Sequence, residues 1–136
     1  MLIEQLKSHG FVHGIDVHWK NDMSEFKLRP VNEEVLKTKS IIYCWFDAYN
    51  NVAMNVGLTS QTIKARFFYS SGYEKWLNGL IEKDKDRPIR YKWLDYFNQC
   101  RSGEVKIYYK PCNPALLRTE EIQMMAALRP ILNVKR

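Results

Sequence analysis

Residues 41–66, IIYCWFDAYNNVAMNVGLTSQTIKAR, restrict the possible folds more than any other part of this chain. The run 40–47 is apolar and aromatic enough for a buried strand, and 52–56 has the pattern of a second, shorter strand. The polar turn sequence YNN separates the two runs, so we expect them to form a β-hairpin. Gly57 is expected to end the second strand, because a residue without a Cβ lets the backbone bend and approach a neighbour closely.

A helix is expected after this glycine. Thr59 or Ser60 can cap its first turn, and Ile63 and Phe67 would form its buried stripe. Arg66 falls on a different face of the same helix. Its guanidinium is therefore expected to point over the hairpin, where it could contact a phosphate.

Three segments of the chain resemble the motifs of the GIY-YIG endonuclease family. Residues 41–43 (IIY) stand where the family has Gly-Ile-Tyr, and residues 55–57 (NVG) stand where it has Tyr-Ile-Gly. Residues 57–66 resemble the family's link from glycine to arginine. Residues 121–133 (EIQMMAALRPILN) resemble its closing helix, with a glutamate and a following Pro-x-x-Asn. The segments occur in the family's order and spacing, and the resemblance covers residues 39–134.

The resemblance implies an α/β (α+β) fold with a three-stranded antiparallel sheet flanked by helices. The nuclease-like domain would span residues 37–136, and residues 1–36 would be an N-terminal extension with a possible β-hairpin. The implied activity is metal-dependent hydrolysis of phosphodiester bonds in double-stranded DNA, with Mg²⁺ or Mn²⁺ as cofactor. A chain this small resembles phage or mobile-element members, which act in the host cytoplasm. Cutting both strands would call for a homo-oligomer or for sequential nicking.

The same resemblance implies roles for particular residues. Glu121 would bind the metal, Arg66 would stabilise the phosphate, and Tyr43 would position or activate the attacking water. Tyr69 and Lys92 are further catalytic candidates by position. Contacts to the nucleic acid are expected from Lys64, Gly57, Asn55, Arg87 and Arg90. Without the resemblance, an acidic residue in the first turn of a helix is also explained by the helix dipole.

The chain departs from the family pattern at three positions. Asn55 replaces the second motif tyrosine, and an amide can form hydrogen bonds but cannot act as a base. Ile41 replaces the first glycine, and Ser70 stands where relatives often have His or Tyr, a role that Tyr69 or Tyr43 could cover. Two other hypotheses therefore stay open. One is a catalytically degenerate nucleic-acid-binding protein on the same scaffold, and the other is a protein-interaction module.

The net charge of +6 is unevenly distributed. Residues 1–36 hold four Lys or Arg and six Asp or Glu, a balance of −2, whereas residues 37–136 hold seventeen and nine, a balance of +8. A basic body is typical of proteins that bind polyanions, although many other small proteins are basic too. Charge thus supports a nucleic-acid partner without defining one.

The rest of the chain alternates helical and strand patterns. Periodicity predicts helices over 1–9, 73–82 and 89–101, and strands over 14–20, 25–29 and 104–110. Asn32 is expected to begin a short helix. The last helix is expected to begin at Asn113-Pro114 or at Thr119, and Asn133 is expected to hold the chain that follows it.

The strand 104–110 alternates apolar residues with Lys106, Tyr108 and Lys110. Basic and aromatic residues on one face suit either an edge strand or a sheet that faces nucleic acid.

The cysteines and histidines favour no metal centre of their own. The three cysteines are scattered without a Cys-x-x-Cys pair, which predicts reduced thiols in a cytosol. His9, His13 and His18 are more simply solvated than zinc-bound, because a structural zinc site needs four ligands and no cysteine lies near them. No apolar run approaches the length of a membrane span.

Overall fold

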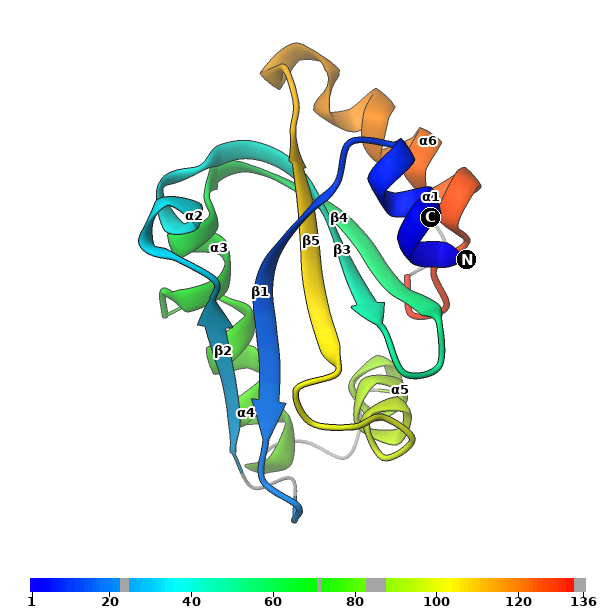
Figure 1. Ribbon diagram of the computed structural model, residues 1–136. Helices are drawn as coiled ribbons and strands as arrows, with labels where there is room; N and C mark the ends of the chain where they lie inside the picture. The colour runs from blue at the N-terminus through cyan, green and yellow to red at the C-terminus, as the bar shows by residue number, and fades with distance from the viewer. Residues whose placement is uncertain (23–24, 71, 83–87, 134–136) are drawn as a thin grey trace.

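The central element is an antiparallel sheet of five strands, in the order β2-β1-β5-β3-β4 (Figure 1). The computed structural model describes residues 1–22, 25–70, 72–82 and 88–133. The strands are β1 (Val12–Trp19), β2 (Phe26–Pro30), β3 (Lys39–Asp47), β4 (Val52–Thr62) and β5 (Val105–Pro111).

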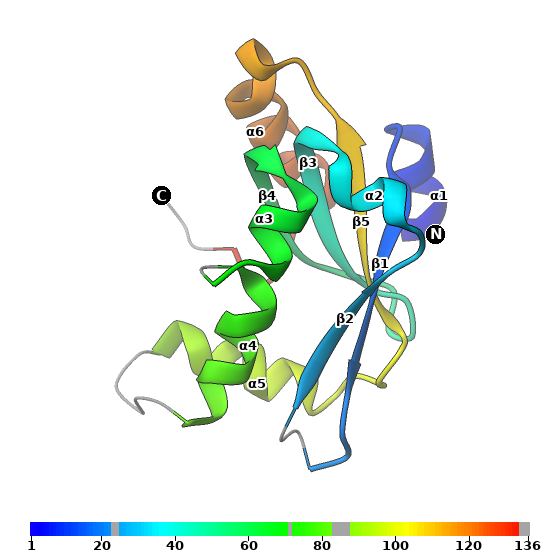
Figure 2. The same ribbon diagram turned by 90° about the vertical axis from the view of Figure 1, so that its left-hand side faces the viewer.

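Helices cover both faces of this sheet. They are α1 (Leu2–Ser8), α2 (Glu33–Lys37), α3 (Ile63–Phe68), α4 (Tyr73–Glu82), α5 (Pro88–Phe97) and α6 (Leu117–Leu128), with a 3₁₀ turn, η1 (Pro114–Leu116), before the last. Figure 2 shows α3, α4 and α5 on one side of the sheet and α1 on the other. Helix α6 packs on β3 and β4 from the side of α1. Among the described residues, no helix has the length and apolar character needed to cross a membrane.

The mixed α+β class is confirmed, but the prediction of a three-stranded sheet is wrong. The hairpin of β1 and β2 forms as expected from its alternating pattern, yet it also pairs with the rest of the sheet through β1 and β5. Burial explains this pairing. Ile15 and Val17 of β1 are 1% and 0% exposed, and they reach the same apolar cluster as the motif strands. A two-stranded hairpin is stable only when further strands or helices cover its apolar face.

Strand β5 therefore lies inside the sheet, between β1 and β3, so the expectation of an edge strand is wrong. Tyr108 is only 6% exposed. Lys106 donates a 2.8 Å hydrogen bond to Asp16, and Lys110 forms a 3.0 Å ion pair with Glu120. These two lysines neutralise carboxylates from neighbouring elements, so they do not form an exposed basic face.

Gly57 does not end the second motif strand. Strand β4 continues to Thr62, whose side chain accepts the 3.1 Å hydrogen bond from Ala65 N that caps α3, so neither Thr59 nor Ser60 is the cap. Gly57 is paired with Tyr43 in the β3–β4 ladder, and a Cβ at Gly57 would overlap the Tyr43 phenol. Glycine is needed at this position because the Tyr43 side chain lies close to the Gly57 backbone, and this contact does not interrupt the strand.

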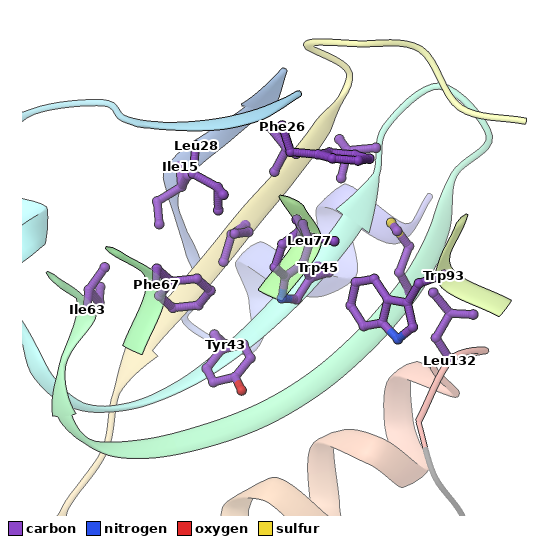
Figure 3. Packing of buried hydrophobic residues seen from close by; sticks show 14 of the residues in the cluster. Ile15, Phe26, Leu28, Tyr43, Trp45, Ile63, Phe67, Leu77, Trp93 and Leu132 are labelled. Atoms are coloured by element: carbon purple, nitrogen blue, oxygen red, sulfur yellow. The ribbon is translucent and has the colours of Figure 1, made fainter. Parts of the chain in front are cut away.

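Strand β3 divides the interior into two clusters, because its side chains alternate between two buried faces. The aromatic core lies under α3, α4 and α5, and Figure 3 shows Tyr43, Trp45, Phe67 and Trp93 within it. The aliphatic core lies under α1 and α6 and includes Leu6, Ile42, Cys44, Phe46, Met124 and Leu128. Near-complete burial of β3 on both faces explains its continuous apolar sequence.

Most of the remaining predicted elements are confirmed, with shifted ends. Helix α2 is capped by Asn32, which accepts a 3.1 Å hydrogen bond from Val35 N. Helix α5 ends at Phe97 rather than at 101, because the turn that follows tightens into bonds between residues three apart, such as Gln99 N to Tyr96 O. Asn113 caps η1, and α6 begins only at Leu117. Residues 83–87, between the helices expected over 73–82 and 89–101, lie outside the described residues.

Candidate active site

A pocket of about 880 Å³ lies along β4, the strand at one edge of the sheet. Its walls come from β3 and β4, from α3 and α4, from α6, and from the segment after α6. Five residues that the sequence assigned to catalysis or nucleic-acid contact line it: Tyr43, Asn55, Gly57, Arg66 and Glu121. Elements that are far apart in the sequence thus contribute to one cavity.

A β-bulge in β4 sets which of its side chains face the aromatic core. Trp45 pairs with Asn55, but the next residue, Phe46, pairs with Ala53, so Met54 is the extra residue. An extra residue shifts the alternation of a strand and redirects its side chains. Asn55 and Gly57 therefore lie on the face that carries Tyr43, and both reach the pocket.

The Tyr43 side chain lies flat enough over Gly57 that only a glycine fits beneath it. A Cβ built on Gly57 would come within 2.5 Å of Tyr43 Cζ and 2.9 Å of Cε1. In Figure 3 the Tyr43 hydroxyl points out of the cluster, towards β4. The motif glycine and the motif tyrosine are thus a single packing unit.

Tyr73 and Arg66 complete a cluster around this phenol. The hydroxyl oxygens of Tyr43 and Tyr73 are 2.9 Å apart, and the Arg66 guanidinium lies 4.5 Å from the centroid of the Tyr73 ring. The Tyr73 ring also stacks on Phe67 at 5.2 Å with an interplanar angle of 24°. Phe67 and Tyr73 come from α3 and α4, so packing between these helices holds the guanidinium and both phenols at the pocket wall.

Burial sets the protonation of this cluster. Burial, followed by the neighbouring Tyr43, raises the pKa of Tyr73 well above its usual value, so Tyr73 is a neutral phenol at physiological pH. Burial acts to lower the pKa of Arg66, but the adjacent Tyr43 and Tyr73 oxygens outweigh it and the net shift is upward. The pocket therefore holds a permanent positive charge beside two hydroxyl groups.

Glu121 places a carboxylate in the same pocket from the first turns of α6. Its side chain is 10% exposed, and among the described residues its one charged contact is with Arg118, whose Nη1 lies 3.8 Å from Oε1. That distance is longer than a hydrogen bond, and the Arg118 side chain is 62% exposed. The carboxylate consequently keeps acceptor capacity for a ligand.

The resemblance implies Mg²⁺ or Mn²⁺ as cofactor, and the carboxylate of Glu121 is the pocket group that could hold such an ion. No group of three or more His, Cys, Asp or Glu within the described ranges could form a protein cage around a metal. Mg²⁺ instead keeps several waters and commonly takes one or two carboxylates. Glu121 offers such a carboxylate. Asn55 is another residue that lines the pocket, and its Oδ1 atom is buried without a hydrogen-bond partner among the described residues.

The segment after α6 closes the outer edge of β4. Ile131 N and Leu132 N donate hydrogen bonds to Ala53 O and Met54 O. Asn133 then pairs with Val56 through both atoms of its side-chain amide, at 2.8 Å each. As expected from the sequence, Asn133 holds the chain in place. It also fixes one wall of the pocket.

The other predicted site residues lie elsewhere. Tyr69 is 52% exposed, and neither it nor the exposed Lys64 lines the pocket. Lys92 is exposed on α5 and does not line the pocket either. Arg90 belongs to α5 with its side chain undescribed, and Arg87 lies outside the described residues.

Three pocket residues were not anticipated from the sequence: Tyr73, Arg118 and Arg129. The sequence predicted only that Tyr73 begins a helix over 73–82, and nothing in the local pattern separates a packing tyrosine from a functional one. Arg129 did carry a signal. It stands directly after a helix and before a proline, where glycine is the usual residue.

Comparison of the chain with protein-family models, with curated proteins and with solved structures gives no match. The pocket and its chemistry are therefore the basis for a functional assignment.

Proposed function

We propose that this protein is a metal-dependent DNA endonuclease of the GIY-YIG type. The observation that carries the proposal is the composition of one pocket. A tyrosine over a glycine, an arginine and a glutamate converge there from four elements, and the sequence resemblance assigns them to one reaction. A guanidinium, a carboxylate and hydroxyl groups around a cavity are the groups that phosphodiester hydrolysis needs.

In this proposal Arg66 binds the non-bridging oxygens of the scissile phosphate. Its position over the Tyr73 ring leaves the planar guanidinium fork fixed before substrate arrives, which favours a two-point contact to phosphate. Fixed positive charge in a partly buried site stabilises the additional negative charge of the transition state.

Tyr43 positions the attacking water. Tyr73 is a positioning residue for it, because a Tyr73 that remains protonated can donate its hydrogen to the Tyr43 oxygen. This bond would restrict rotation of the Tyr43 hydroxyl and keep it directed at the pocket. Tyr73 thereby supplies a second phenol in a chain whose second motif position is Asn55.

Glu121 is the metal ligand in this proposal, with the Asn55 oxygen as a further neutral ligand. A bound Mg²⁺ or Mn²⁺ would supply charge relief at the phosphate and help the leaving oxygen depart. The low exposure of Glu121 strengthens its attraction for a cation, because nearby water screens it less.

A catalytically degenerate nucleic-acid-binding protein is the second candidate, and Asn55 is the observation that favours it. An amide at this position cannot accept a proton from water as a base would. The two candidates share the basic pocket and differ in turnover.

Incubating supercoiled plasmid with the purified protein distinguishes the nuclease from the binding protein. The nuclease proposal expects nicked or linear product with Mg²⁺ or Mn²⁺ and none with EDTA. Glu121→Gln, which keeps the shape and removes the charge, should reduce cutting by at least about a hundredfold while DNA binding remains. If the wild type binds DNA but leaves the plasmid intact with either metal, the binding protein is the correct reading.

A further inference from the structure

Arg129 has a backbone conformation that its residue type disfavours. It follows α6 with φ 49° and ψ 59°, in the left-handed region, and its N–H bonds to Met125 O at 3.0 Å. This position at a helix end is usually occupied by glycine, which adopts a positive φ without steric strain. Pro130 follows directly, so the helix cannot continue in a relaxed form. An arginine here lowers stability relative to glycine.

The Arg129 side chain is exposed, and it lines the pocket. The charged residues around the cavity are Arg66, Arg118 and Arg129 against Glu121, so three positive charges and one negative charge leave +2. The proposed nuclease reaction uses Arg66 and Glu121 and leaves Arg129 without a role. A disfavoured conformation that is kept at a pocket wall points to a function for the side chain.

The chemistry of the pocket identifies the ligand. A cavity of about 880 Å³ is larger than one phosphate group requires, and its positive charges come from three places, namely α3, the start of α6 and the end of α6. A polynucleotide strand presents a negative phosphate at every nucleotide. A second guanidinium in the same pocket, on the segment that ends α6, therefore suits a second phosphate of the same strand.

We propose that Arg129 binds a DNA phosphate next to the scissile one and so fixes the register of the strand in the pocket. This inference rests on the proposed function. The competing explanation is that a positive residue at the C-terminus of α6 only interacts favourably with the helix dipole. That role would affect folding alone and would leave DNA binding unchanged.

Arg129→Gly and Arg129→Lys distinguish the two explanations. Binding of a fluorescein-labelled duplex is measured by anisotropy in EDTA over a range of salt concentrations, alongside thermal unfolding of each variant. We expect Arg129→Gly to bind roughly five- to tenfold more weakly at low salt, with a salt slope smaller by about one. Its melting temperature should equal or exceed that of the wild type, because glycine relieves the strain.

Arg129→Lys keeps the charge and should bind within about twofold of the wild type. Arg101→Gln is the control, because Arg101 is exposed, contacts Tyr49 and does not line the pocket, so its neutralisation should leave affinity unchanged. Unchanged affinity and salt slope in Arg129→Gly overturn the inference, as does an equal loss in Arg129→Lys.

The same measurements separate this inference from the nuclease proposal. If the wild type binds DNA without cutting it, the nuclease proposal fails and the phosphate role of Arg129 is still decided by the salt slopes. If the wild type shows no salt-dependent binding to DNA, both are overturned.

Discussion

The two faces of the sheet are built from different side chains, although both are packed against helices. The aromatic core contains most of the ring contacts, with Trp45, Phe67, Tyr73 and Trp93 joined by stacked, tilted and edge-to-face contacts. The aliphatic core on the other face is mainly Leu, Ile, Val, Met and Cys. The pocket lies at the β4 edge, where both faces contribute to it.

This difference between the two cores shows which side chains of the pocket are held in place by packing. Arg66, Tyr43 and Tyr73 are held by large rings with few rotatable bonds, which favours a preorganised phosphate contact. Glu121 comes from α6, on the aliphatic side, and no ring packs against it in the contacts of the described residues. We therefore expect the aromatic core to control the geometry of Arg66 and the two tyrosines, and the aliphatic core to act mainly on stability.

The largest expected effect tests this division with one chemical change on each face. Phe67 and Phe46 are 0% and 2% exposed, in the aromatic and the aliphatic core respectively. Changing either to Ala should destabilise the protein by about 3–5 kcal/mol, measured by urea unfolding. Only Phe67→Ala should also reduce the activity of the remaining folded protein, since Phe67 contacts Tyr43 and Tyr73. Equal losses of activity in the two variants would contradict the comparison.

A smaller effect is expected from removing a single hydroxyl group. Tyr73→Phe keeps the ring and deletes the hydrogen bond to Tyr43, so the rate of plasmid cutting should fall by about tenfold, or about 1.4 kcal/mol. Tyr108→Phe is the matched control, because Tyr108 packs in the aliphatic core and lies outside the pocket. Its rate should stay within about twofold of the wild type. A Tyr73→Phe enzyme with full activity would remove the positioning role.

The smallest effect concerns acid stability and the outer part of the sheet. Burial raises the pKa of Asp16, but its hydrogen bonds to Lys106 and His13 lower it by more, so the net shift is downward. A lowered pKa stabilises the folded state above the usual Asp value of 3.8 and loses that contribution as the pH falls through the folded value.

Asp16→Asn should therefore be less stable than the wild type at pH 6, by on the order of 0.5 kcal/mol. The difference should shrink below a pH of about 4. Urea unfolding at pH 6 and at pH 3 measures it, and activity per folded molecule should not change. A difference that persists unchanged at pH 3 would show that the charge is not the cause.

The local pattern of the chain predicted much of the fold. Alternation identified β1, β2 and β5, and apolar runs identified β3 and the start of β4. Asn32 was recognised as a cap, because a side-chain oxygen next to free backbone N–H groups is a local property. Asn113 was one of two expected starts of the last helix, and it caps the 3₁₀ turn η1 instead. The buried stripe of Ile63 and Phe67 was also correct, since helical spacing decides which residues share a face.

Errors occurred where one local signal has two physical causes. Glycine can end a strand or make room for a neighbour, and Gly57 makes room for Tyr43, which stands fourteen positions earlier in the sequence. Lys106 and Lys110 alternate as exposed residues do. They are instead paired with Asp16 and Glu120, which only the packing of β1 and α6 brings near them.

By itself, the sequence determined most of the helices and strands, because hydrophobic period is a property of neighbouring positions, and it indicated five of the residues that line the pocket: Tyr43, Asn55, Gly57, Arg66 and Glu121. Only the tertiary structure decided that the N-terminal hairpin extends the motif sheet to five strands. It alone placed Tyr73 against Tyr43, and the end of α6 in the same pocket as Arg66. The physical reason is that these contacts join distant segments, and burial of shared apolar surface selects them among many pairings that the local pattern allows equally.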